Sequence, residues 1–156
     1  MARIPTLITH AGDALGDSTL ACLYLNDLAS PQTVIPAGAD AWRMWSLYAI
    51  ADGLIEAQIA MRAEYLRDEH ERSSRFLGKQ QDRIRRCFDA LEQRVDELDR
   101  PLDLAQITVG VACGYQDWRE WLDPYQAEHP ALASWSERFA QRASMIATQP
   151  TETPQR

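Results

Sequence analysis

The most apolar helix expected in this sequence lies between residues 103 and 119, which read DLAQITVGVACGYQDWR. The run from Ile107 to Cys113 is almost wholly apolar, so a helix here would be surrounded by other helices. Asp103 can accept a hydrogen bond from the free N–H groups of the first turn, and Gln106 can reach back in the manner of a capping box. The sequence therefore predicts a capped, central helix at this place.

Two glycines, Gly110 and Gly114, lie one turn apart on that helix and would let a neighbouring helix approach closely. The apolar run is far too short to span a bilayer, so this spacing is not a membrane-dimer motif. Apolar stripes and stop signals predict further helices at residues 40–67 and 74–98, and another that starts at His129-Pro130 and buries Leu132, Trp135 and Phe139. A last turn or two is expected at 144–148.

The first 30 residues follow a different pattern from the helical remainder. Short β-prone runs at residues 6–9 and 14–15 flank a turn, and a helix follows from Asp17 or Ser18 to about residue 29. Two strands this short cannot stand alone and need other strands, the helices or another chain. A linker rich in Pro, Gly and Ala follows, so the fold class is mainly α, with a β-β-α unit before a helical bundle.

The composition excludes several classes of function. The 156 residues carry a formal charge of −7, which disfavours nucleic acid and anionic membranes as partners. No apolar run approaches a membrane span, and the N-terminus does not read as a signal peptide. We therefore expect a cytoplasmic protein with buried, reduced thiols and, because the three histidines form no helical pair, no metal site; the thiols belong to Cys22, Cys87 and Cys113.

Several segments, taken in order, resemble the glutathione S-transferase family of bacteria. The Ile-Pro pair is similar to the motif before the third strand of that family's thioredoxin-like domain, and Gly16-Asp17-Ser18 is similar to its acidic-Ser turn into a helix. The other matching segments are Leu20–Leu28, with the family's Tyr-Leu pair, Leu104–Arg119 as the central helix, and His129-Pro130-Ala131-Leu132 with Trp135 and Phe139 as the penultimate helix.

The resemblance implies a division into a partial thioredoxin-like, glutathione-binding domain at 1–30, a helical C-terminal domain at 31–150 and a disordered tail at 151–156. In the family a strand–helix–strand–helix segment precedes the Ile-Pro motif and carries the residue that engages the glutathione sulfur. Here Met1 stands just before that motif, so the expectation is an N-terminally truncated member.

The resemblance also implies a glutathione site at Ile4, Pro5, Asp17, Ser18 and Asp52. The family's proline is cis and turns the preceding backbone toward the glutathione cysteine. Asp17 and Ser18 suit the γ-glutamyl end of glutathione, although both also serve as a simple helix cap. Asp52 could contact glutathione across a dimer, but a solvated helix charge is the preferred interpretation.

A second-substrate pocket is expected between the long helix and the central helix, with core packing as the alternative for most of its residues. The candidates are Gln58, Met61, Arg62, Tyr65, Tyr115 and Trp118. The family conjugates glutathione, its substrate, to hydrophobic electrophiles in detoxification, and it forms homodimers. We expect this truncated chain to be weak or inactive, and the alternative is a non-catalytic dimerisation or ligand-carrying module.

Overall fold

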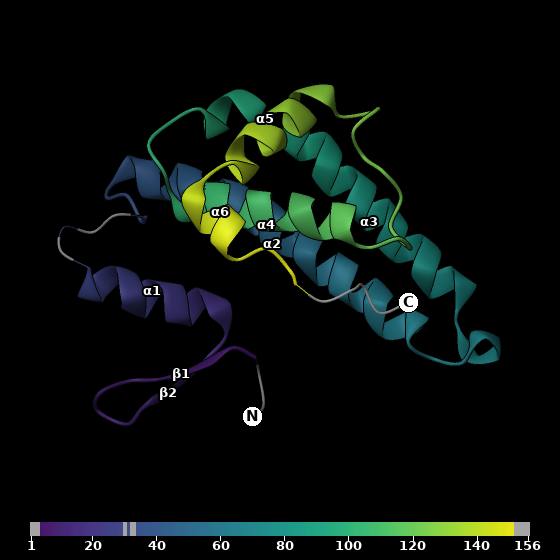
Figure 1. Cartoon of the computed structure of the whole chain (residues 1–156), viewed down its shortest axis with the longest axis horizontal. Coiled ribbons are helices and arrows are strands. Elements are labelled where there is room, and N and C mark those ends of the chain that lie inside the picture. The colour runs from purple at the N-terminus through teal and green to yellow at the C-terminus, as the bar shows by residue number, and fades with distance from the viewer. Residues whose placement is uncertain (1–3, 30, 32–33, 152–156) are drawn as a thin grey trace.

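A helical bundle with a small hairpin unit beside it makes up the structure, a computed structural model that describes residues 4–29, 31 and 34–151 (Figure 1). Its elements are β1 (Thr6–Ile8), β2 (Ala14–Gly16), α1 (Ser18–Leu28), α2 (Ala39–Tyr65), α3 (Ser74–Glu92), α4 (Leu104–Trp118), α5 (Pro130–Ala140) and α6 (Ala143–Ala147), with 3₁₀ turns η1 (Glu69–Glu71) and η2 (Val95–Leu98). The mainly α fold class and the β-β-α start are confirmed. Most of the predicted tail, residues 152–156, lies outside the described residues.

The N-terminal unit is an antiparallel hairpin with one helix. Leu7 of β1 pairs with Leu15 of β2. Gly12 has a φ of 91° in the connecting turn, a conformation that glycine adopts without steric cost. In Figure 1 this unit lies beside the bundle rather than inside it. Its helix α1 buries only Ala21 and Asn26, so it is packed more lightly than α2.

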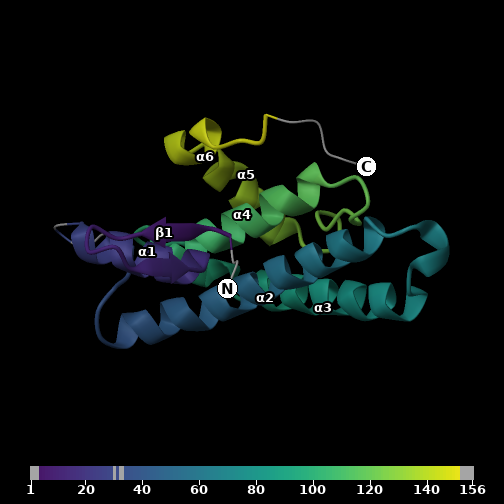
Figure 2. The same cartoon turned by 90° about the horizontal axis from the view of Figure 1, so that it is seen from below.

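The bundle is built around α2 and α4. Helix α2 packs against both α3 and α4, and α4 also contacts α5. The predicted central helix is confirmed, because α4 contributes a continuous buried stripe from Leu104 to Cys113. The Val34 carbonyl, just before α2, accepts from the Leu104 N–H at the start of α4, and the Tyr65 ring at the end of α2 lies 5.2 Å from that of Trp121 beyond the end of α4. Helices α2 and α4 therefore run parallel (Figure 2).

The start of α4 is capped as the sequence predicts. The Asp103 carboxylate accepts from the Gln106 backbone N–H at 3.0 Å. The Gln106 side chain, however, does not complete a capping box, because its amide donates at 3.1 Å to the carbonyls of Arg100 and Pro101. The second Asp103 oxygen lies 2.7 Å from the Arg100 guanidinium, so this buried carboxylate joins the cap to the preceding loop.

The predicted helix over residues 74–98 is in fact two elements. Helix α3 ends at Glu92, and the separate turn η2 buries Leu98. The break falls at Arg94, whose φ of −119° and ψ of 16° leave the helical region. Its guanidinium donates to Glu97 at 2.7 Å and to the Ser46 hydroxyl at 3.0 Å, which ties the break to α2.

The thiols are all unpaired. Cys113 is buried, and Cys22 and Cys87 are half-buried. Burial raises the pKa of the Cys113 thiol to about 12, so it stays protonated at neutral pH. Within the described ranges no group of three or more His, Cys, Asp or Glu side chains is placed to hold a metal, and no described helix has the length and apolar character needed to cross a membrane.

Candidate functional site

The loop before β1 is tied to the start of α1. The Ile4–Pro5 peptide bond is cis, as the resemblance implies. The Pro5 carbonyl accepts from the backbone N–H of Asp17 at 3.0 Å. Ile4 is 98% exposed, so the backbone on this side of the proline faces open space beside the helix start.

Asp17 is the N-cap of α1. Its carboxylate accepts from the Thr19 backbone N–H at 2.8 Å, and its φ of 121° places the backbone outside the helical region. Ser18, the first helical residue, is exposed. The capping interpretation of this turn is therefore confirmed, and the free end of the helix, with its positive dipole and an accessible hydroxyl, suits an anion.

The first turn of α1 is joined to α2 by side chains. The Thr19 and Tyr48 hydroxyls lie 2.6 Å apart. Burial is the main cause that raises the pKa of the Tyr48 hydroxyl, and the Asp52 and Asp17 carboxylates raise it further, while the Thr19 hydrogen bond lowers it. Asp17 bonds to Thr19, whose hydroxyl contacts Tyr48, and Asp52 lies one helical turn after Tyr48 on α2, so both carboxylates lie toward the contact between α1 and α2.

Two of the residues expected in the second-substrate pocket lie elsewhere. Gln58 is fully buried, and its amide donates to the Ala112 carbonyl at 3.0 Å and to the Gln116 side chain at 2.7 Å. Met61 is only 3% exposed and lies on the α3 side of α2. The sequence pattern predicted that both residues line a pocket between the long helix and the central helix. In the structure Gln58 instead forms a buried hydrogen-bonded link between α2 and α4, and Met61 packs on the side of α2 that faces α3.

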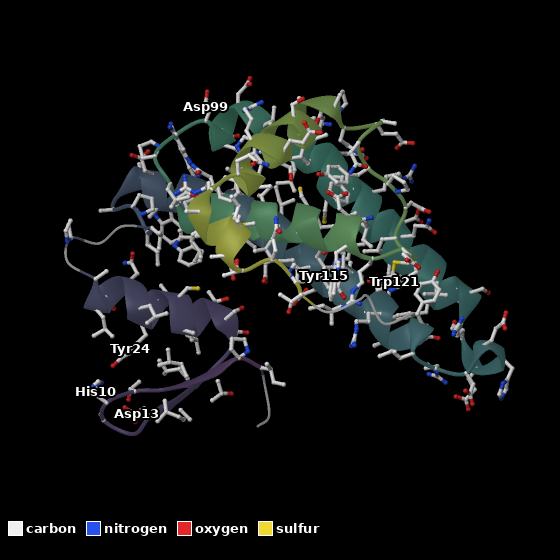
Figure 3. All side chains as sticks on the ribbon, in the orientation of Figure 1. His10, Asp13, Tyr24, Asp99, Tyr115 and Trp121 are labelled. Carbon is white, nitrogen blue, oxygen red and sulfur yellow. The ribbon has the colours of Figure 1, made fainter. Side chains whose placement is uncertain are left out.

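The remaining candidates gather at the far end of α2 and α4. The Tyr65 and Trp121 rings lie 5.2 Å apart, and the Tyr115 and Trp118 rings lie 6.1 Å apart. In Figure 3 Tyr115 and Trp121 are seen near the C-terminal end of α4. Arg62 is half-buried on α2. The cation over the Tyr65 ring is that of Arg72, whose guanidinium carbon lies 5.5 Å from the ring centroid.

Sequence reasoning missed one residue of this cluster, Arg119. It is buried, with its guanidinium carbon 3.8 Å from the Trp118 ring centroid and 4.9 Å from that of Tyr115. Arg119 follows Tyr115 by four residues, and side chains at this spacing are neighbours along a helix. This spacing is the sequence signal that could have identified Arg119.

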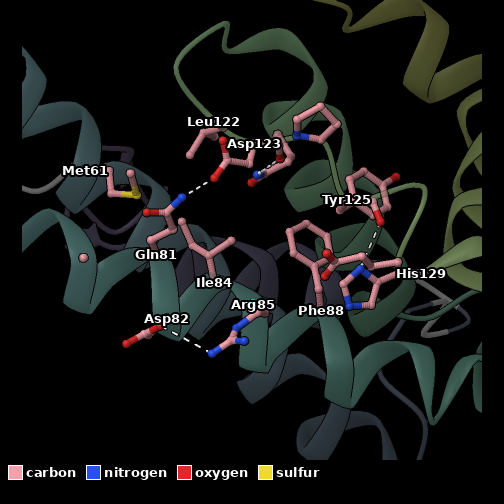
Figure 4. Close-up of a pocket in the computed structure, with 14 residues that line it drawn as sticks. Met61, Gln81, Asp82, Ile84, Arg85, Phe88, Leu122, Asp123, Tyr125 and His129 are labelled. Carbon is pink, nitrogen blue, oxygen red and sulfur yellow. Dashed lines mark hydrogen bonds and ion pairs between the residues drawn. The ribbon is translucent and has the colours of Figure 1, made fainter.

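Two hollows flank the cluster. One, of about 700 Å³, lies between α4, α5, α6 and residues 148–150, and Tyr115 and Trp118 form part of its wall. The other, of about 440 Å³, lies between α3 and the loop after α4 (Figure 4). There the Gln81 amide donates to Asp123, and the His129 ring nitrogens lie 2.9 Å from Asp89 and 3.0 Å from the Tyr125 carbonyl. Because these groups satisfy one another, we interpret the second hollow as structural.

Solved structures of known proteins share this fold. No family model matches the sequence. A glutathione transferase family member from Pseudomonas fluorescens Pf-5, solved with bound S-(propanoic acid)-glutathione, is 35% identical, with a TM-score of 0.89 over 96% of this chain and 77% of that chain. A glutathione S-transferase from Methylobacillus flagellatus KT, solved with glutathione bound, is 28% identical, with a TM-score of 0.87 over 96% of this chain and 76% of its own.

A curated relative agrees with these structures. The uncharacterized GST-like protein YibF of Escherichia coli K12 is 25% identical over 154 residues, which are 96% of this chain and 76% of YibF. The chain belongs to the glutathione transferase family. Its 156 residues correspond to about three quarters of each of these relatives.

Proposed function

We propose that the hairpin unit and the adjoining face of α2 bind glutathione. The observation that carries this proposal is the hydrogen bond from the Asp17 N–H to the Pro5 carbonyl, which holds the cis Ile4–Pro5 segment against the capped start of α1. Two family members similar to this chain were solved with glutathione or a glutathione conjugate bound, which supports the same ligand here.

Each part of this site suits one part of glutathione. The N-terminus of α1 and the exposed Ser18 hydroxyl favour the γ-glutamyl carboxylate. Asp17 and Asp52 offer negative charge to the γ-glutamyl ammonium, and Asp52 reaches the same neighbourhood from α2. The backbone at Ile4 and Pro5 is presented for the central cysteine of the tripeptide.

The second substrate is a hydrophobic electrophile, bound where α2 and α4 end together. Of the six residues expected there, Arg62, Tyr65, Tyr115 and Trp118 stay in the proposal, while Gln58 and Met61 leave it because both are buried in the core. The aromatic rings supply apolar contact area with defined faces. In this proposal the protein acts in cytoplasmic detoxification as a homodimer.

The 156 residues by themselves are proposed to be weak or inactive as a transferase. Catalysis in the family needs a group that stabilises the glutathione thiolate, and proximity alone does not supply that stabilisation. Neither Ser18 nor the Tyr48 hydroxyl fills this role: Ser18 corresponds to the turn serine, and burial raises the pKa of the Tyr48 phenol.

A non-catalytic module that docks or carries ligands is the alternative function. Apolar side chains on the outer face of the hairpin unit favour it, because Ile8 is 64% and Leu28 63% exposed. Such a module would keep the aromatic cluster and need no glutathione.

Calorimetric titration of the 156-residue chain with glutathione tests the proposal. Wild type is expected to bind at millimolar concentration or below, and Ser18→Ala to bind about tenfold more weakly because one hydrogen bond to a carboxylate is lost. Ser134→Ala, an equally exposed helical serine on α5, serves as the matched control and should leave affinity unchanged. No heat of binding to folded wild type would favour the non-catalytic module instead.

A further inference from the structure

Arg119 has an unusual environment for a cation. Of the described residues it is the one buried Lys or Arg, with 7% of its surface exposed. The buried acids Glu64 and Asp103 each have a hydrogen-bonded partner, at 2.5 and 3.0 Å. Arg119 has none among the described residues: no carboxylate lies within 4.0 Å of it, and its Nε is buried without a hydrogen-bond acceptor.

The aromatic contacts orient Arg119 without neutralising it. Stacking on Trp118 and Tyr115 covers the flat face of the guanidinium, and a cation–π contact offsets only part of the cost of burying the charge. The end of α4 contributes a partial negative charge, which is also smaller than a full counter-ion. The edge of the guanidinium, which carries its N–H donors, stays without an anion.

Arg62 on α2 brings a second positive charge close to the end of α4 along the bundle axis. Gln58 of α2 contacts Ala112 and Gln116 of α4, and Tyr65 contacts Trp121, so in these parallel helices Arg62 lies level with the end of α4. It is half-buried and forms no ion pair with any described residue. The nearest acid on α4, Asp117, forms no ion pair with Arg119 and instead accepts a hydrogen bond from the Gln126 side-chain amide at 2.6 Å.

Glutathione itself does not reach this place when it is anchored at the hairpin unit. The Thr19–Tyr48 contact marks that anchor, and Arg62 lies 14 residues further along α2, or about 21 Å at 1.5 Å per residue. Three α-linked residues span at most about 11 Å, and the γ-glutamyl linkage of glutathione lengthens this by only about 3 Å, so the molecule still falls short of about 21 Å. The anion that suits Arg119 therefore belongs to the molecule beyond the glutathione sulfur.

We propose that Arg119 binds a carboxylate on the second substrate, with the charge of Arg62 on α2 adding to the attraction, so that the preferred electrophiles are acidic molecules with an apolar or aromatic body. This inference rests on the proposed function, since it names the substrate class of that same site. The guanidinium fork holds the carboxylate in two parallel hydrogen bonds, and the rings of Tyr65, Tyr115 and Trp118 contact the body.

A matched pair of unreactive probes tests the inference on the 156-residue chain. 3-Phenylpropanoate and 3-phenylpropanamide have the same shape and differ in charge, and their binding is followed by tryptophan fluorescence and calorimetry at low salt. Wild type is expected to bind the acid at least about tenfold more tightly than the amide. Equal affinities would overturn the proposal without any variant.

Variants then assign the preference to one side chain. Arg119→Met should remove the preference for the acid while leaving amide affinity within about twofold, and Arg119→Lys should keep part of it. Arg142→Met is the matched control, because Arg142 also lies over a ring, 5.4 Å from Phe139, but is exposed. A folded Arg119→Met protein that still prefers the acid overturns the proposal. Should that variant not fold, the Arg119→Lys and wild-type comparisons decide the question.

The glutathione titration separates this inference from the proposed function. Loss of glutathione binding with an intact acid preference would overturn only the proposed function. Glutathione binding with no acid preference would overturn only the assignment of Arg119.

Discussion

Asp103 shows how one side chain can serve two elements. One carboxylate oxygen caps α4, and the other pairs with Arg100 in the loop that leads into it. Both interactions are buried, so solvent screening weakens them little. Removing the carboxylate leaves an uncapped helix N-terminus and an arginine without its partner.

We therefore expect Asp103→Ala to lower the free energy of unfolding by about 2 kcal/mol or more, at the upper end of the range for a lost cap. Urea denaturation followed by circular dichroism measures the change. Asp99→Ala is the matched control, because Asp99 is exposed four residues earlier, and it should cost less than about 0.5 kcal/mol. Equal losses in the two variants would show that the cap is energetically minor.

The sequence predicted the roles of some residues and not of others. The Asp103 cap follows a local rule that involves four consecutive residues, so the sequence is sufficient. Gln58 and Arg119 depend on which neighbours the fold supplies. A glutamine at helical spacing is compatible with a pocket or with a buried hydrogen bond, and only the approach of α4 decides between them.

At the scale of elements, the packing of α4 on α5 depends on one glycine. A Cβ on Gly110 would lie 2.5 Å from Cδ1 of Phe139, closer than carbon atoms approach without displacement. Gly114, one turn later, has no atom within 4 Å of the equivalent position. The sequence predicted a close approach at both glycines, and the structure confirms it at Gly110 alone.

Gly110→Ala should therefore destabilise the protein by about 1–3 kcal/mol, since the Phe139 ring must shift and it is itself stacked on Trp135. Gly114→Ala should stabilise it, by up to about 1 kcal/mol, because alanine is the better helix former at an open position. Thermal unfolding of the two variants gives the comparison. If Gly110→Ala stabilised the protein, the Phe139 ring of α5 would have to move away from the added methyl group at no cost, which would contradict this prediction.

Element boundaries were predictable where a local signal exists. Pro130 at the first position of α5 and the apolar stripe of α4 both placed their helices correctly. The break after Glu92 was not predictable from periodicity, because Val95 and Leu98 continue the apolar spacing of α3. Arg94 breaks the helix by bonding to Glu97 and to Ser46 on α2, and that second contact exists only in the folded molecule.

At the scale of the whole molecule, the hairpin unit and the bundle differ in how much surface they bury. Helices α2 and α4 are lined with fully buried side chains, whereas α1 buries only Ala21 and Asn26. Its side-chain tethers include the Thr19–Tyr48 contact and the Asn26 side-chain carbonyl, which accepts from the backbone N–H groups of Val34 and Ile35 at 3.2 Å. A unit held in this way opens at lower free energy than the bundle unfolds.

Hydrogen exchange should reveal this difference. Amides in residues 6–28 are expected to be at least about 100-fold less protected than those in residues 105–113, and saturating glutathione should slow exchange over 6–28 selectively. Asn26→Ala should speed exchange in residues 6–28 further, because two backbone N–H groups lose their acceptor, while Asp27→Ala, at the exposed neighbouring position, should not. Uniform protection across both regions would show instead that the hairpin unit folds and unfolds as one body with the helices, and the glutathione site would then be as rigid as the core behind it.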